Sequence, residues 1–273
     1  MLFRSWDEAR SAVDAALHEL VSPRELAAAL ASASEFVDSG ETLSRGSGWG
    51  ALEIEAGSLA AVPGLPFGSC DTAQRPWLEL LGSGRLPVCD PPAAPVVGPR
   101  WRELLEARAE DWHALYHLGL MRLADGDDAA ARDAFERSVG ERPTPWALRA
   151  LGFLAGSAEE AADLAAEAHR LLPELRELTI EALDALLRAD RSGEALALIE
   201  ALPQADRQHG RIRLAQARAA HASGDDERVR VLLAEGVRVD NMREGELSLD
   251  ALWAAVHPGQ PVPAAYDFRM SEG

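Results

Sequence analysis

Lysine is absent from this chain of 273 residues, and all 27 of its basic residues are therefore arginine. The absence excludes the phosphate-loop lysine, the Schiff-base lysine and the lysine general base. Cysteine is scarce, and Cys70 and Cys89 are expected to be free thiols because a large helical chain rarely depends on one disulfide. No apolar run approaches the roughly 20 residues of a membrane span, and the amphipathic start is not typical of a signal peptide, so we expect a cytoplasmic protein.

The charge balance is strongly acidic. The chain has 45 acidic and 27 basic residues, which gives a formal net charge of −18. Nucleic acids and anionic membrane surfaces would be repelled overall. The sequence therefore predicts that neither is a partner.

One pattern recurs about four times between residues 112 and 241. In its clearest copy, WHALYHLGLMRLADGDDAAARDAFERSVGERP, the offsets of a tetratricopeptide repeat are occupied by Leu118, Gly119, Ala131, Phe135 and Pro143. Two short helices joined by a tight turn are expected for each copy. The large residue of this pattern, Phe135, is predicted to be buried between neighbouring hairpins.

The later copies are less regular. The second closes on Pro173, thirty residues after Pro143, and the third closes on Pro203. The fourth repeats the turn of the first, with Gly224 followed by two aspartates. Because one repeat cannot bury its apolar face alone, we predict an all-α, tetratricopeptide-like solenoid over 99–273, with a capping helix near 247–256.

The first 98 residues are predicted to form a separate helical region. A helical hairpin is expected over 1–37 and a helix near 51–61, and a proline-rich boundary follows at 90–99. Four tryptophans occupy apolar positions of amphipathic helices and are expected in the core: Trp6, Trp77, Trp101 and Trp253. Trp49, on a glycine-rich loop, is expected to be exposed.

Three segments carry a resemblance to a known group of proteins: RPWLELLGSGRLP, TPWALRALG and MREGELSLDALW. They resemble the C-terminal half of an uncharacterised bacterial family in which a carbohydrate-related β-sandwich precedes tetratricopeptide repeats. The resemblance implies that this chain is a fragment, or a relative without the front domain, and it implies a link to glycan metabolism by association only.

The candidate catalytic and metal-binding residues are explained more simply by structural roles. His113 and His117 have the spacing of two ligands to one metal, but the local sequence supplies no third ligand. Asp125, Asp127 and Asp128 fit a polar turn better than a calcium loop. No nucleophile lies in a catalytic motif, so we predict no catalytic residue, no metal and no organic cofactor, and a non-enzyme is favoured while the enzyme alternative stays open.

The sequence supports a binding groove better than it supports a catalytic or metal site. If the first helix of each repeat lines the concave face, an arginine-rich and aromatic stripe results. Its predicted residues are His113, Tyr116, Trp146, Arg149, Arg176, Arg211, Arg218 and His221.

The sequence thus favours a non-catalytic module that binds a protein or peptide partner. Acidic tails are one candidate partner and a β-sandwich domain is another. The alternative is the helical half of a glycan-active assembly, in which Trp49 and Trp77 stack on sugar together with Trp146.

Overall fold

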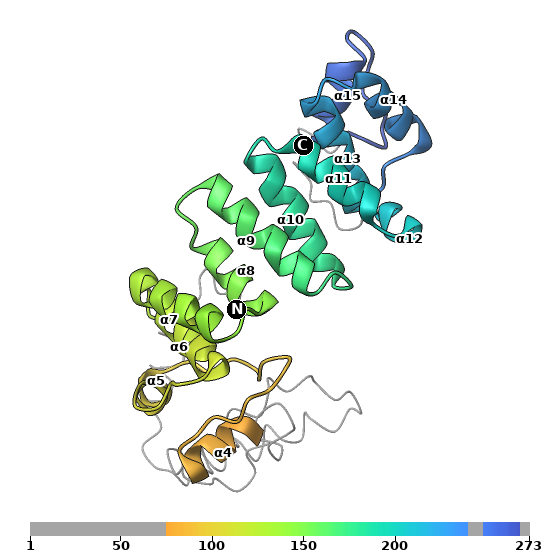
Figure 1. The fold of residues 1–273 in the computed structure, drawn as a ribbon. Coiled ribbons are helices and arrows are strands. Elements are labelled where there is room, and N and C mark those ends of the chain that lie inside the picture. The colour runs from red at the N-terminus through yellow and green to blue at the C-terminus, as the bar shows by residue number, and fades with distance from the viewer. Residues whose placement is uncertain (1–74, 240–247, 268–273) are drawn as a thin grey trace, which may run out of the picture. The chain divides into compact units, whose positions relative to one another are not determined.

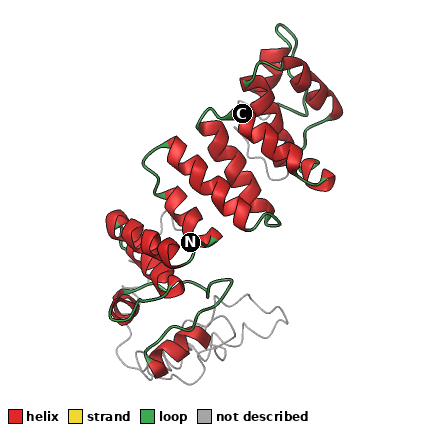
Figure 2. Ribbon diagram, viewed as in Figure 1, coloured by secondary structure: helices red, strands yellow, loops and turns green. Residues whose placement is uncertain are grey.

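The computed structural model describes residues 75–239 and 248–267. The predicted hairpin over 1–37, the helix near 51–61, Trp6, Trp49 and Cys70 lie outside these ranges. Every regular element within them is a helix, which confirms the all-α prediction (Figures 1 and 2). No helix in this part of the chain is long and apolar enough to cross a membrane. The chain divides into two compact units, Met1–Val96 and Val97–Gly273.

The described part of the first unit contains α4 (Arg75–Ser83) and the extended segment that follows it. Trp77 is fully buried, and its indole Nε1 donates a hydrogen bond to the carbonyl of Ala94 at 2.8 Å. The core position predicted for this tryptophan is confirmed. Cys89 is a free thiol, and burial raises its pKa.

The second unit is built of consecutive helical hairpins. Its described helices are α5 (Pro99–Glu106), α6 (Trp112–Ala124), α7 (Asp128–Glu141), α8 (Pro145–Phe153), α9 (Ala158–Leu171), α10 (Arg176–Arg188), α11 (Ser192–Ala201), α12 (Gln204–Arg207), α13 (Gly210–Ala222), α14 (Asp226–Glu235) and α15 (Ser248–Val256). The pairs α6/α7, α8/α9, α10/α11 and α13/α14 form hairpins, and each packs against the next. The unit is a tetratricopeptide-like helical repeat.

Polar residues set the helix boundaries. The carboxylate of Asp111 accepts from the amides of His113 and Ala114 at the start of α6, and that of Asp127 accepts from the amide of Ala130 at the start of α7. Between these helices Gly126 has a φ of 78°, a left-handed conformation that suits glycine. The polar-turn interpretation of Asp127 is confirmed.

Close packing inside the first hairpin depends on Phe135. This side chain and Ala131 are fully buried, as the repeat pattern predicts. On the same helix, the hydroxyl of Ser138 faces α6 and donates to the carbonyl of Trp112 at 2.6 Å. The first hairpin is therefore held by both an apolar wedge and a buried hydrogen bond.

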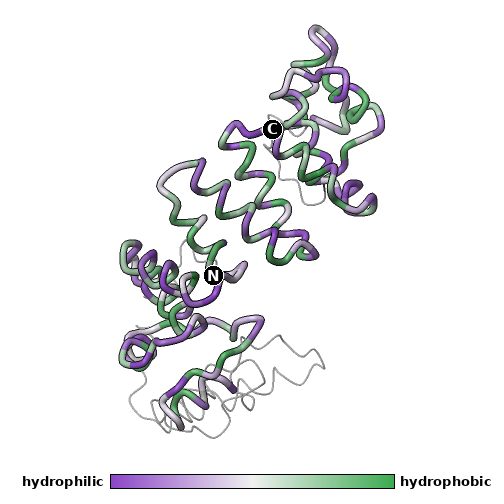
Figure 3. The backbone as a smooth tube through the Cα atoms, viewed as in Figure 1, coloured by the Kyte–Doolittle hydropathy of each residue, from purple (hydrophilic) through white to green (hydrophobic). Residues whose placement is uncertain are grey.

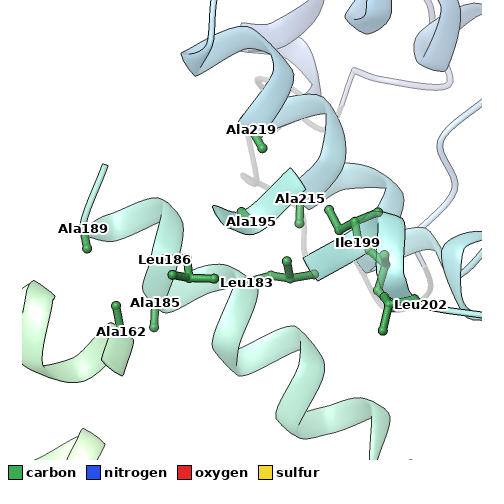
Figure 4. Packing of buried hydrophobic residues seen from close by; sticks show 11 residues of the cluster. Ala162, Leu183, Ala185, Leu186, Ala189, Ala195, Ile199, Leu202, Ala215 and Ala219 are labelled. Carbon is green, nitrogen blue, oxygen red and sulfur yellow. The ribbon is translucent and has the colours of Figure 1, made fainter. Parts of the chain in front are cut away.

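Two of the further cores lie among the later helices of the unit. The first joins α10, α11 and α13, and Figure 4 shows Leu183 and Ile199 within it. The second lies under α15, where Leu249 is fully buried, and the hydroxyl of Tyr266 donates to the carbonyl of Leu233 at 2.7 Å. The predicted capping helix is thus confirmed. Hydrophobic and hydrophilic positions alternate within the turns of these helices, as expected for helices with one buried face (Figure 3).

Ion pairs connect the second helices of successive hairpins, or the residue directly before such a helix, at a constant sequence separation of 28 residues. The pairs are Arg132 with Glu160, Asp163 with Arg191, and Glu200 with Arg228. We call this series the 28-residue ladder. Each of its pairs joins neighbouring hairpins, in keeping with a fold of nearest-neighbour contacts.

Candidate functional site

A groove of about 1170 Å³ is centred on α8 in the second unit. We call it the α8 groove. Its apolar part is lined by Tyr116, Leu120 and Leu123 from α6, and by Trp146, Ala150 and Phe153 from α8. Small residues of α9 form one wall, Ala158, Ala161 and Ala165. Its charged part consists of Arg149 together with Glu181, Asp184 and Arg188 of α10 and Arg218 of α13.

The groove coincides with a helix that is one turn shorter than its counterparts. The first helices of the other repeats, α6, α10 and α13, each have 13 residues, whereas α8 has 9. A helical turn contains about 3.6 residues, so the difference of four residues is about one turn. We call the space beyond the end of α8 the missing-turn notch.

Side chains fix the point at which α8 ends. The hydroxyl of Ser157 accepts from the amide of Glu160, and the Glu160 carboxylate accepts from the amide of Gly156 at 2.7 Å. These contacts start α9 early. From α7, the Arg132 guanidinium donates to the carbonyl of Leu154 at 2.6 Å and to Glu160 at 2.8 Å. The turn between α8 and α9 is therefore tied to the preceding hairpin.

The charged part of the groove contains three arginines and two carboxylates. The Arg149 guanidinium donates to both carboxylate oxygens of Glu181, at 2.6 and 2.7 Å, and this pairing raises the pKa of the arginine. Arg218 donates to Asp184 at 3.3 Å. The Arg188 guanidinium instead donates only to the backbone carbonyl of Asp184, at 3.3 Å, and no carboxylate in the described ranges pairs with it. One arginine of the groove thus has no carboxylate partner among the residues that the structure describes.

Four of the eight predicted groove residues line the α8 groove: Tyr116, Trp146, Arg149 and Arg218. Tyr116 packs near Phe135, with ring centroids 5.9 Å apart, and burial raises the pKa of its hydroxyl. The indole Nε1 of Trp146 is buried, and no described residue accepts a hydrogen bond from it. The groove therefore combines two of the predicted arginines with both predicted aromatic residues.

The other four predicted residues do not lie on the groove. Arg176 pairs with Asp206 at 3.0 Å, Arg211 is exposed on α13, and His221 contacts Asp226 at 2.8 Å. His113 is fully buried. The expectation that His113 lies on the groove is wrong, because the phase of α6 places this histidine in the core, whereas Tyr116, about 60° away around the helix axis, lies at the edge of the groove.

His113 and His117 form a buried pair. Their Nε2 atoms lie 3.2 Å apart, and both side chains are fully buried. Burial, with a smaller contribution from His113, lowers the pKa of His117 to about 3. In the part of the chain that the structure describes, no group of three or more histidine, cysteine or acidic residues is placed to hold a metal. The pair is best explained as part of the core, in which His117 is neutral at pH 7.

The predicted sugar-stacking tryptophans do not contribute to the described site. Trp49 lies outside the described residues. Trp77 is buried with its ring edge bonded to Ala94, so it cannot present a face to a ligand. The stacking prediction for Trp77 is therefore wrong, since its indole is part of the core of the first unit.

Sequence reasoning missed Glu181, Asp184, Arg188 and Phe153. A usable signal existed for the carboxylates, because Glu181 follows Arg149 by 32 residues and Asp184 precedes Arg218 by 34. These separations are close to one repeat, which places both members of a pair on the same face of adjacent hairpins. Phe153 carried no comparable signal, because its exposure results from the early end of α8.

No family model matches the sequence, and no curated protein matches it. Among solved structures, the chain is similar to a thermophilic TPR protein of Thermus thermophilus. The identity is 20% and the TM-score 0.34, over 57% of this chain and 86% of the other.

Proposed function

We propose that this chain is a non-catalytic binding module whose α8 groove holds a peptide segment of a partner protein. The observation that supports this most strongly is Phe153, a large aromatic side chain that lines the groove and is 78% exposed. Exposed apolar surface beside polar groups is typical of protein interaction sites, and aromatic residues contribute much of the binding energy at such sites.

The size of the groove favours a peptide over a small metabolite. Small-molecule pockets usually have volumes of roughly 300 to 1000 Å³. At about 1170 Å³ the α8 groove exceeds this range, and side chains from several helices line it. A segment of several residues fits such a surface better than a single small molecule.

The charges of the groove favour an acidic segment. The whole chain carries a net charge of −18, whereas the α8 groove has three guanidinium groups and two carboxylates. An extended polyanion such as nucleic acid would meet the acidic remainder of the molecule, but a short acidic tail would meet only the groove. A β-sandwich partner would have to present such a segment as a loop or tail.

The groove supports binding better than catalysis. Ser157 is the one hydroxyl at the short turn, and it is engaged as the cap of α9. Glu181 and Asp184 are engaged by Arg149 and Arg218, so they are ion-pair partners and not a free acid and base. The glycan alternative has weaker support, because Trp77 is buried and Trp49 is not described, which leaves Trp146 as the single tryptophan of the three that is described on the groove.

The proposal is tested by selecting phage-displayed random peptides on the immobilised chain. Recovered peptides should bind the unaltered chain and should lose binding to Ala161→Trp, in which an indole fills the groove. Circular dichroism must show that this variant keeps its helices. Hydrogen exchange of the complex should show protection in α6, α8 and α10, and protection elsewhere alone would contradict the proposal.

A further inference from the structure

We infer that the α8 groove recognises its peptide through two linked contacts. A large apolar side chain of the peptide occupies the missing-turn notch beside Phe153, and a nearby carboxylate of the same peptide binds Arg188. The inference rests on the proposed function and specifies the chemistry of the partner segment.

The notch has the surroundings of an apolar subsite. Leu120 and Leu123 of α6 and Ala161 and Ala165 of α9 line the groove of which it is a part. The two alanines leave room for a ligand side chain in the notch, because their own side chains end at Cβ. Phe153 exposes most of its ring at the same place, so a second apolar side chain would cover surface that is now in water.

The notch is preformed. Arg132 holds the carbonyl of Leu154 and the carboxylate of Glu160, and that carboxylate also holds the amide of Gly156. The turn that follows α8 is therefore held by side chains of α7 and α9. A preformed subsite binds more tightly than one that must be ordered by its ligand.

Arg188 supplies the charged contact. The guanidinium groups of Arg149 and Arg218 are engaged by carboxylates of α10, but that of Arg188 is engaged only by a backbone carbonyl within the described ranges. A planar guanidinium binds a carboxylate through two parallel hydrogen bonds. Charge complementarity thus selects an acidic residue at this end of the groove.

The apolar notch together with Arg188 disfavours two simpler kinds of peptide. A purely acidic segment would leave the notch and Phe153 exposed, and it would also meet Glu181 and Asp184. A purely apolar segment would cover the Arg188 guanidinium without pairing its charge, which costs free energy. A segment with both features satisfies both parts of the surface.

The test uses peptides selected from a phage-displayed random dodecapeptide library on the full chain, labelled with fluorescein and measured by fluorescence anisotropy. The recovered sequences should share a large apolar residue near an aspartate or glutamate. Changing the apolar residue to alanine should weaken binding by at least about tenfold. Changing the acidic residue to its amide should weaken binding by about threefold to tenfold.

Variants of the chain assign each contact. Phe153→Ala should weaken binding, whereas Val231→Ala, which truncates an exposed apolar residue of α14 outside the groove, should not. Arg188→Gln should weaken binding, whereas Arg211→Gln, which changes an exposed arginine of α13 outside the groove, should not. In a double-mutant cycle, Arg188→Gln should remove the effect of the acid-to-amide change in the peptide.

Different binding results would contradict the two-contact recognition and the peptide-binding function itself. Peptides that need the groove but lack either the apolar or the acidic residue overturn the inference and leave the proposed function standing. An additive double-mutant cycle also overturns the Arg188 contact. If no recovered peptide loses binding to Ala161→Trp or to Phe153→Ala, the proposed function itself is wrong.

Discussion

Gly119 lies so close to Phe135 that a Cβ atom on the glycine would be 2.4 Å from the Cε1 atom of the ring. The aromatic ring of α7 therefore rests directly on the backbone of α6. Because Phe135 is fully buried, the ring cannot move into solvent to make room. This contact sets the separation of the first pair of helices.

Gly119→Ala should destabilise the fold by about 1–3 kcal/mol, because an added methyl group must displace a buried ring. The measurement is the urea midpoint of unfolding. Gly140→Ala is the matched control, since a Cβ there meets no atom within 4 Å. The control should be neutral or stabilising, because alanine favours the helical backbone over glycine. Equal midpoints for the two variants would contradict this role of Gly119.

Phe135→Ala should cost about 3–5 kcal/mol, because it removes a buried aromatic side chain and leaves a cavity between hairpins. The free energy of unfolding is again obtained from urea titration. Phe153→Ala removes the same side chain from an exposed position and should leave the midpoint nearly unchanged. An unchanged midpoint for Phe135→Ala would show that the repeat alignment is wrong.

The stability of the second unit should fall as the pH is lowered below about 6.5. The folded-state pKa of His117 is lowered to about 3, so between these values the unfolded chain binds a proton that the folded chain excludes. Because unfolding takes up a proton in this range, a lower pH favours the unfolded state and reduces the free energy of unfolding. From this residue alone the loss between pH 7 and pH 5 is about 2 kcal/mol.

The pH prediction is measured by urea unfolding at a series of pH values. His117→Gln should flatten the dependence between about pH 7 and pH 5, even if the variant is less stable throughout. His221→Gln, which changes an exposed histidine, should retain the original slope. A parallel slope in wild type and His117→Gln would exclude His117 as the cause.

Arg132→Met should loosen the turn between α8 and α9. The change removes the donors to the carbonyl of Leu154 and to Glu160, while the apolar stem is retained. The amide of Gly156, which donates to Glu160, should then exchange its hydrogen faster. Arg137→Met is the control, because Arg137 pairs with Asp133 within α7. Equal protection of Gly156 in both variants would show that Arg132 does not fix the turn.

The sequence predicted the parts of the fold that local patterns determine. Phe135 and Ala131 follow from repeat offsets, and Asp127 with Gly126 follows from turn chemistry. The capping helix follows from a single apolar stripe. In each case residues a few positions apart specify the structure, so no knowledge of distant contacts is needed.

The groove was only partly predictable, because its details depend on contacts between hairpins. Arg149 was assigned correctly to the groove, but its carboxylate partner lies on the next repeat. His113 was misplaced, because a groove position was assigned without knowing which face of α6 packs inside. The early end of α8 depends on Arg132, whose contact with Leu154 spans 22 residues. No local sequence pattern around Phe153 predicts the contact between Arg132 and Leu154.

The constant separation in the 28-residue ladder has a consequence for how this chain can change its length. Each pair joins a residue to one 28 positions away, as Arg132 is joined to Glu160 and Asp163 to Arg191. A duplicated 28-residue unit that contains Asp163 would place this residue 28 positions from its own copy, so two carboxylates would meet where Asp163 now pairs with Arg191. An insertion of a few residues within a helix would shift every later side chain around the helix axis and break the pair across that point. The ladder thus opposes both small insertions and duplicated hairpins, because each pair needs opposite charges as well as the 28-residue separation.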